Sequence, residues 1–404
     1  MSAVHARGVS AEHVLRDAQD FSLVLGGPLF QLFRRAHLSD DALLLVRQRV
    51  VFIALLGWLP LFALTAAEGN LVGGATLPFL KDLEVHVRFL VVVPLLIVAE
   101  LVVHQRLHPI ATTFLQRHLI PESALERFDK AISEAFRWRN STLGESLLMA
   151  IVYGVGVLYV WRQYMAFDVA TWYAKPGPGG STLTAAGMWF GYVSLPMFQF
   201  LLIRWYFRLL IWTRFLWHVS RIQLCLVPAH PDRLAGLGFL SSTVHAFGLL
   251  LLAHGALLAG NLANRIFFLG ASLVDFKYEI AVMVGFLLCV VLLPLLVFTP
   301  QLASAKRVAV REYGTLAERY VREFDAKWLR GQAPGDEPLV GSADIQSLAD
   351  LANSYEVVRG MRLAPVTRDA LIQLAATAAA PLLPLTLTMM PLEELLKRLA
   401  GLLF

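Results

Sequence analysis

The chain has 404 residues, of which 57% are hydrophobic and only 16% are charged, and its net charge is +5. Soluble domains carry about 25% charged residues, so this composition excludes an ordinary soluble protein and indicates a membrane protein. The basic residues are concentrated in some loops and form no basic-aromatic module, so nucleic acid is not an expected partner. The two cysteines, Cys225 and Cys289, lie far apart without metal-ligand spacing, and we expect no disulfide, metal or cofactor.

The predicted fold is all-α, a polytopic helical membrane protein with six or seven transmembrane helices. A hydrocarbon core about 30 Å thick needs roughly 20 apolar residues in a helix. Six stretches meet this requirement or come close to it: 50–67, 89–103, 147–161, 185–203, 239–262 and 280–299. Residues 370–392 are uncharged but contain Pro381 and Pro384. They predict either a seventh span or a re-entrant hairpin, followed by the tail to residue 404.

The distribution of Lys and Arg predicts the orientation. Residues 1–49 and the segment between spans two and three hold six each, residues 204–238 hold five and residues 300–369 hold ten, against two in each of the other three connecting segments. Positive charge accumulates on the cytoplasmic side of membrane proteins, so we expect a cytoplasmic N-terminus. We therefore expect residues 1–49 and 300–369 to be cytoplasmic.

The cytoplasmic segments predict a helical collar around the spans. Residues 21–36 could lie in the membrane interface, and residues 121–139 have the 3–4 residue spacing of an amphipathic helix that opens at Pro121. Residues 300–369 predict a long charged helix ended by Gly331 and a second helix capped by Ser342. The external segment 173–181 is rich in Pro and Gly and predicts an unstructured connector.

Ionisable residues near the cytoplasmic ends of the spans are the main functional signal. Glu100 lies inside span two, where a lone carboxylate is costly, so we expect it to be paired or protonated. Arg204 and Arg208 enter from the same side at similar depth, as does Glu145 at the start of span three. They could form a structural ion pair that locks the helices or a polar pocket that opens to the cytoplasm.

The four arginines at 204, 208, 214 and 221 leave a choice of roles open. Their gaps of four, six and seven residues do not suit a voltage sensor. They could instead snorkel to anionic lipid, or the first two could pair with an acid inside the bundle.

Span five adds His245, His254 and Asn261 to the candidate ion path, although polar residues there more often bond across helices. Gly255 on the same span, with small residues at four-residue steps, predicts close helix contact. Glu100, His104 and His108 have ligand-like spacing, but no second motif supports a metal site.

The loop 228–240 carries His230, Asp232 and Arg233. A catalytic pair of His230 with Asp232 would need a nucleophile or metal partner that the sequence does not supply. The alternative is a turn in which the Asp232 carboxylate caps the following backbone.

Four motifs carry a family resemblance: "HPDRLAGLGFL", "REYGTLAERYVREFDAKWLRG", "GSADIQSLADL" and "MMPLEELLKRL". With them the chain resembles a group of bacterial multi-pass inner-membrane proteins for which the resemblance implies no activity. It implies a location in the bacterial inner membrane. Leu234 and Ala235 stand where the resemblance leads us to expect Ala and Gly, so the distance at which the backbone packs against its neighbours can differ at this turn.

These observations favour a channel or transporter, in which Glu100, Arg204, His245 and His254 line an ion or anion path. One alternative is a scaffold or sensory protein that acts through its cytoplasmic helices. Another is a membrane enzyme acting on lipid head groups, although an enzyme is less favoured because no nucleophile is evident. The expected partners are the bilayer, anionic lipid at the four arginines, and a second copy of the chain.

Overall fold

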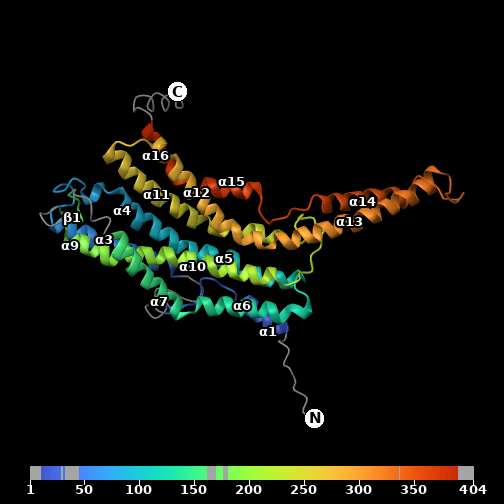
Figure 1. Ribbon diagram of the computed structural model, residues 1–404, viewed down its shortest axis with the longest axis horizontal. Helices are drawn as coiled ribbons and strands as arrows, with labels where there is room; N and C mark the ends of the chain where they lie inside the picture. Colours follow the sequence, from blue (N-terminus) through green and yellow to red (C-terminus); the bar gives the residue numbers. More distant parts are fainter. Residues whose placement is uncertain are drawn as a thin grey trace, which may run out of the picture.

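The computed structural model describes residues 11–28, 31, 45–161, 170–175, 181–335 and 337–389. Long helices run along the longest axis of the molecule, and strands are almost absent from the described part (Figure 1). Within that part, six helices are long and apolar enough to cross a membrane, and a bent helix pair would make a seventh. The prediction of an all-α multi-pass membrane protein is confirmed. The six candidate spans are Val46–Ala67, Leu83–Gln116, Ala185–Ser220, Leu237–Leu269, Leu273–Leu329 and Arg368–Met389.

The second span is longer than its apolar stretch predicted. It combines α4 (Leu83–Val87), the π-helical segment η2 (Arg88–Val92) and α5 (Val93–Gln116), and it lies beside α3 (Val46–Ala67). The helix continues past residue 103 because its last turns bury further apolar side chains in the protein core. Stability beyond the lipid therefore comes from packing of one helix face rather than from apolar length.

The third span is a bent pair. The amphipathic helix predicted after Pro121 is α6 (Leu125–Arg139), which buries Phe128 and Ile132 and packs along α10 (Leu195–Ser220). Ser141 caps α7 (Thr142–Ile151), which continues into the π-helical η4 (Val152–Trp161) and meets α6 at 48°. The bend separates a charged amphipathic helix from an apolar one.

The fourth span joins α9 (Ala185–Trp189), η5 (Phe190–Ser194) and α10 (Leu195–Ser220), and a hairpin precedes it. The predicted unstructured connector is wrong in part, because β1 (Ala174–Lys175) pairs with β2 (Thr182–Leu183). The Pro and Gly residues predict a turn, but they do not predict that the neighbouring Trp172 anchors this segment to the protein core. Its ring is fully buried and its Nε1 donates to Oδ2 of Asp82 at 2.8 Å. We call this end of the bundle the hairpin end.

The fifth span begins as a 3₁₀ helix, η6 (Leu237–Phe247), and continues as α11 (Gly248–Leu269). The predicted close helix contact at Gly255 is confirmed, since a Cβ there would lie 2.0 Å from the carbonyl oxygen of Ala378 on α15 (Arg368–Ala379). Figure 1 shows α11 and α15 side by side with α12 (Lys277–Leu292). The chain beyond α15 continues through short helical turns to residue 389.

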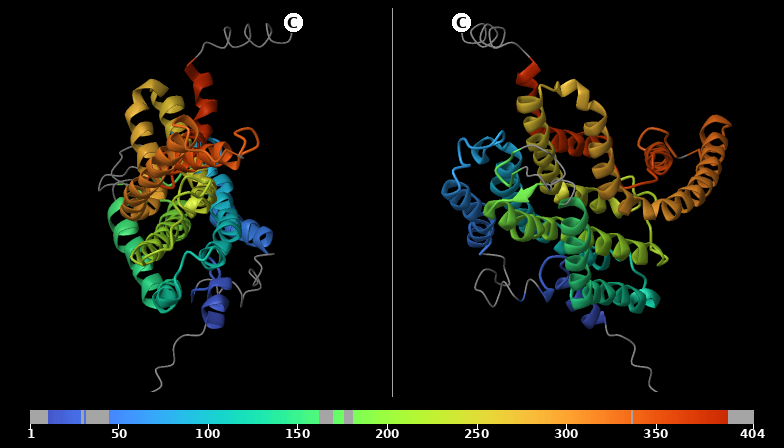
Figure 2. Two further views of the ribbon diagram at one scale, coloured as in Figure 1. Left: turned by 90° about the vertical axis from the view of Figure 1, so that its right-hand side faces the viewer. Right: turned by 60° about the vertical axis from the view of Figure 1, so that its left-hand side comes forward.

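The sixth span extends far past the bundle at the opposite end. It comprises α12 (Lys277–Leu292), η8 (Leu293–Phe298), α13 (Thr299–Phe324) and η9 (Asp325–Leu329), and α14 (Ala343–Arg359) folds back along α13 (Figure 1; Figure 2). As predicted, Gly331 takes a left-handed conformation after the helix and Ser342 caps α14. We call this projection the arm, and the end that carries it the arm end.

The described part of the N-terminal segment packs against the bundle through one face of α1 and through the buried residues 21–24. Helix α1 (Ala11–Gln19) packs on α5 and α6, and Phe21 is fully buried against Phe215 and Phe136. The rest of the predicted interfacial stretch, residues 29–30 and 32–36, lies outside the described residues. The remaining short elements are η1 (Phe79–Lys81), η3 (Glu122–Ala124), η7 (Leu273–Phe276), η10 (Ala380–Leu382), α16 (Leu383–Thr386) and η11 (Leu387–Met389).

Candidate functional site

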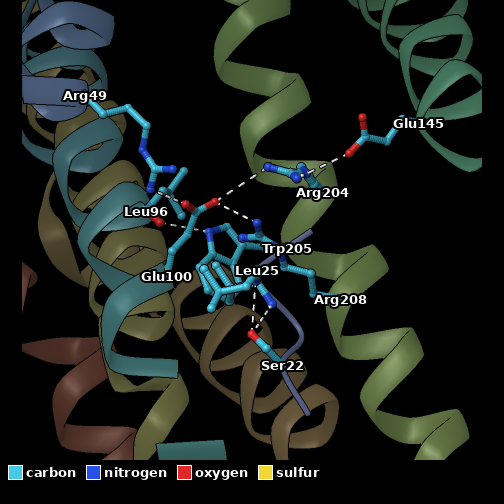
Figure 3. Close-up of polar contacts among 10 residues, drawn as sticks. Ser22, Leu25, Arg49, Leu96, Glu100, Glu145, Arg204, Trp205 and Arg208 are labelled. Atoms are coloured by element: carbon cyan, nitrogen blue, oxygen red, sulfur yellow. Dashed lines mark hydrogen bonds and ion pairs between the residues drawn. The ribbon is translucent and has the colours of Figure 1, made fainter. Parts of the chain in front are cut away.

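The carboxylate of Glu100 is the centre of a buried cluster of charges (Figure 3). Its Oε1 accepts a hydrogen bond from Nη2 of Arg208 at 2.7 Å and lies 3.7 Å from Nη1 of Arg204. Its Oε2 pairs with Nη2 of Arg49. All four residues are 6% exposed or less. A lone carboxylate at this depth would be strongly unfavourable, so the guanidiniums satisfy a charge that the bilayer interior cannot.

Three helices bring the cluster together. Arg49 comes from α3, Glu100 from α5, and Arg204 with Arg208 from α10, where the four-residue spacing puts both guanidiniums on one face. Nε1 of Trp205 donates to the backbone oxygen of residue 96 at 3.1 Å and holds α10 against α5. The pairing of Arg204 and Arg208 with Glu100 is one of the alternatives that the sequence left open.

Sequence reasoning missed Arg49, which precedes span one like an ordinary flanking charge. The signal was its position at the same end of its span as Glu100 on the following span.

Glu145 extends the cluster, since its Oε1 lies 3.3 Å from Nη2 of Arg204. Beside this pair is a void of about 10 Å³ lined by residues that include Arg139, Arg204, Arg208 and Glu145. That volume holds at most about one water molecule. The described lining thus contains three guanidiniums and one carboxylate around a very small space.

Residues 21–27, which we call the plug, close this space. Gly27 has φ +89°, its N–H donates to Oδ1 of Asn140 at 3.0 Å, and a Cβ on it would lie 3.2 Å from Oε1 of Glu145. Nη1 of Arg139 donates to the backbone oxygen of Ser22 at 2.7 Å. Only glycine fits the conformation and the close approach at Gly27 without strain. The plug therefore separates the charge cluster from the surroundings on this side.

The side chain of Ser22 also secures the plug to α5. Its hydroxyl lies 3.0 Å from Nδ1 of His104 and accepts the backbone N–H groups of residues 24 and 25. The rings of His104 and His108 lie edge to face, 5.1 Å apart. His104 thus contacts the plug while Glu100 turns towards the arginines.

A second polar network at the hairpin end escaped sequence reasoning. Glu84 pairs with Arg88 and accepts a hydrogen bond from Nδ2 of Asn261 at 3.1 Å. Asp82 accepts from Nδ2 of Asn264 at 2.8 Å, and the Asn264 Oδ1 in turn accepts the N–H of residue 83. The available signal was the pair of asparagines one turn apart on α11 and the acids that open α4. Asn261 therefore belongs to a helix–helix network and not to the Glu100 cluster. Its partner Glu84 precedes Glu100 by 16 residues on the same span, which is about 24 Å along a helix.

The remaining candidates on span five do not join the Glu100 cluster either. His254 donates from Nδ1 to the backbone oxygen of residue 250 at 2.8 Å, so its Nε2 accepts the hydroxyl of Tyr206 at 2.6 Å. His245 lies on η6, and among the described contacts of Glu100 it contributes none.

The last two arginines of the long helix have other partners. Nη2 of Arg214 donates to Oε2 of Glu134 at 3.1 Å, and His218 lies against the same oxygen. The guanidinium of Arg221 lies 4.1 Å from the ring centroid of Trp217. The four arginines thus fall into two pairs. Arg204 and Arg208 form ion pairs inside the bundle, whereas Arg214 and Arg221 lie outside the charge cluster.

The loop of His230, Asp232 and Arg233 is a tightly bonded turn. The Asp232 carboxylate accepts the backbone N–H groups of residues 234, 236 and 238 at 2.7, 3.2 and 2.8 Å. Burial raises the pKa of Asp232, but these donors outweigh it and hold the pKa below its usual value. His230 lies against the same carboxylate at 3.1 Å, and the backbone oxygen of Arg233 accepts the N–H of Arg362 at 2.8 Å. The carboxylate caps the turn, as one of the two sequence interpretations expected.

Three residues of this loop have a left-handed backbone conformation. Arg233, Ala235 and Gly236 have φ values of +56°, +53° and +95°. An alanine in the left-handed region is strained, so the many bonds to Asp232 must stabilise this conformation.

Comparisons of the chain with models of protein families, with curated proteins and with solved structures find no match.

Proposed function

We propose that the protein is a bacterial inner-membrane transport protein for small anions, with the Glu100 cluster and the plug as its closed cytoplasmic gate. The convergence of five ionisable side chains at one depth carries the proposal. Such groups are costly inside a membrane and typically mark an ion pathway. The orientation rests on the distribution of Lys and Arg, which favours a cytoplasmic N-terminus.

The charge around the void supports an anion. Arg139, Arg204 and Arg208 present guanidiniums to it, with Glu145 as the one carboxylate in its described lining. Guanidinium groups attract anions and repel cations. In the closed arrangement Glu100 and Glu145 form ion pairs with the guanidiniums. On opening, the passing anion would replace these carboxylates as the partner of the guanidiniums.

The second network supports a gate at the other end of the same helix. Glu84 and Arg88 lie on α4 and η2, and Glu100 lies on α5 of the same continuous span. The π-helical η2 interrupts the regular helix between them, and such segments frequently occur at functional sites. Movement of this one helix would affect both polar networks.

Chloride efflux from proteoliposomes tests the proposal. We expect the wild-type protein to release chloride faster than protein-free liposomes, and Arg139→Gln, which removes a half-buried guanidinium from the void, to slow release. Arg265→Gln is the matched control, because that arginine is exposed at the hairpin end and pairs with Glu279. Release at the protein-free rate under gradients of either direction, or equal rates for the Arg139 and Arg265 variants, would refute anion transport.

The arm favours a second candidate, a scaffold or sensory protein. Leu329 and Val340 at its tip are 71% and 89% exposed, and α14 packs along α13 and is bonded to η9 through Asp344. Exposed apolar groups on a projecting helical hairpin suit contact with another protein. Leu329→Glu should then abolish an in-cell cross-link to one stoichiometric partner without changing chloride efflux. If no such cross-link forms in the wild type, this candidate fails.

A further inference from the structure

A long apolar groove runs along the outside of α3. Its first part, of about 760 Å³, follows one face of the helix from Arg47 to Pro60. Its second part, of about 360 Å³, lies between α3, the third span and α10, and the two parts share Phe52 and Leu56. The lining side chains Phe52, Met149 and Tyr192 are 42–50% exposed. The groove therefore faces outward from membrane-spanning helices.

The groove covers one half of the membrane. From Arg47 to Pro60 the helix rises about 20 Å, which matches half of a 30 Å hydrocarbon core plus part of the headgroup region. Near its inner end the hydroxyl of the lining residue Tyr153 donates to the backbone oxygen of Tyr192 at 3.3 Å. Pro60 and Tyr153 both lie near the middle of their apolar stretches. The groove thus begins at one membrane surface and ends near the midplane.

The outer end carries Arg47 and Gln48, the two polar side chains among the described lining residues of the first part. Both are exposed, in contrast to Arg49, which points into the Glu100 cluster. A guanidinium at headgroup depth attracts lipid phosphate, and an apolar groove as long as one leaflet is thick matches the length of an acyl chain.

We propose that this groove is a specific phospholipid site, with acyl chains along α3 and the phosphate at Arg47. The lipid belongs to the leaflet on the side of Arg47, which the distribution of Lys and Arg predicts to be cytoplasmic. The matching length, the apolar lining and the basic outer end identify a phospholipid rather than a protein helix as the occupant. The proposal is independent of anion transport.

Native mass spectrometry of delipidated protein with added dioleoyl phosphatidylglycerol tests the site. The wild-type protein should retain bound lipid at collision energies that remove the detergent. The double variant Leu56→Trp with Met149→Trp fills the groove and should abolish retention. Arg47→Gln should weaken binding by about fivefold, the effect of one basic side chain near an anionic membrane surface.

Matched controls separate this site from ordinary bilayer lipid. Val282→Trp with Phe286→Trp places the same two rings on α12, where the native side chains are 72% and 52% exposed. Arg307→Gln removes an exposed arginine from α13. Both controls should bind lipid like the wild type. Equal retention in the groove-filled variant, or an equal loss in both double-tryptophan variants, would overturn the proposal.

Discussion

Replacement of Glu100 by Gln should destabilise the protein strongly. The change keeps the shape of the side chain but removes the negative charge that three guanidiniums share. All of these residues are 6% exposed or less, so water cannot replace the lost partner. Removal of one partner from a buried ion pair typically costs about 3–5 kcal/mol. That is a large part of the roughly 5–15 kcal/mol that stabilises most folded proteins.

The free energy of unfolding in mixed micelles, measured by titration with SDS and followed by circular dichroism, gives the comparison. Glu279→Gln is the matched control, since the pair of Glu279 with Arg265 is 48% and 41% exposed and should contribute at most about 1 kcal/mol. The double variant Glu100→Gln with Arg208→Gln should lose less than the sum of the single losses, because the two residues are in contact. If Glu100→Gln costs no more than Glu279→Gln, the buried charges do not stabilise one another in the closed arrangement and the reasoning is wrong.

Two further changes test the packing around the site. Asp232→Asn should lower the free energy of unfolding by about 1–3 kcal/mol, because its amide cannot accept all three backbone N–H groups. The wild-type advantage should be present above pH 3.8 and should disappear as the pH falls through the lowered pKa of Asp232, which a series of thermal melts would detect. Gly255→Ala should cost about 1–3 kcal/mol in the same unfolding titration, because its Cβ would meet the backbone of Ala378 at 2.0 Å. Gly285→Ala, with no atom within 4 Å, should cost nothing; equal effects of the two alanines would contradict the close contact.

The sequence predicts the spans well because they depend on local apolar composition. It also places Glu100 and Arg204 at similar depth and offers their pairing as one alternative, because depth along a helix follows from residue count and an unpaired charge must find a partner. It cannot show which of several equally deep groups approach one another. His245 and His254 have suitable depth, yet the rotation of α11 and η6 directs them elsewhere.

The missed residues share a physical cause. Arg49, Asp82 and Ser22 lie at helix ends or in connecting segments. In such places a polar composition predicts exposed side chains, and only the tertiary packing determines which of them are buried. The plug is the clearest case. Two glycines and a serine resemble an ordinary linker. Their role in closing the space depends on the backbone conformation at Gly27 and on its hydrogen bond to Asn140, which lies in another part of the chain.

Chloride efflux from proteoliposomes that contain Gly27→Ala tests the gate most directly. The added Cβ would meet the backbone oxygen of Arg139 at 3.0 Å and strain a residue with φ +89°, so the plug should be displaced. Gly270→Ala has a similar φ of +67° but no neighbour within 4 Å, and Asn140→Ala loosens the plug without added bulk. We expect faster efflux for the Gly27 and Asn140 variants than for the wild type and the Gly270 variant. Unchanged or slower efflux in both plug variants would contradict the account.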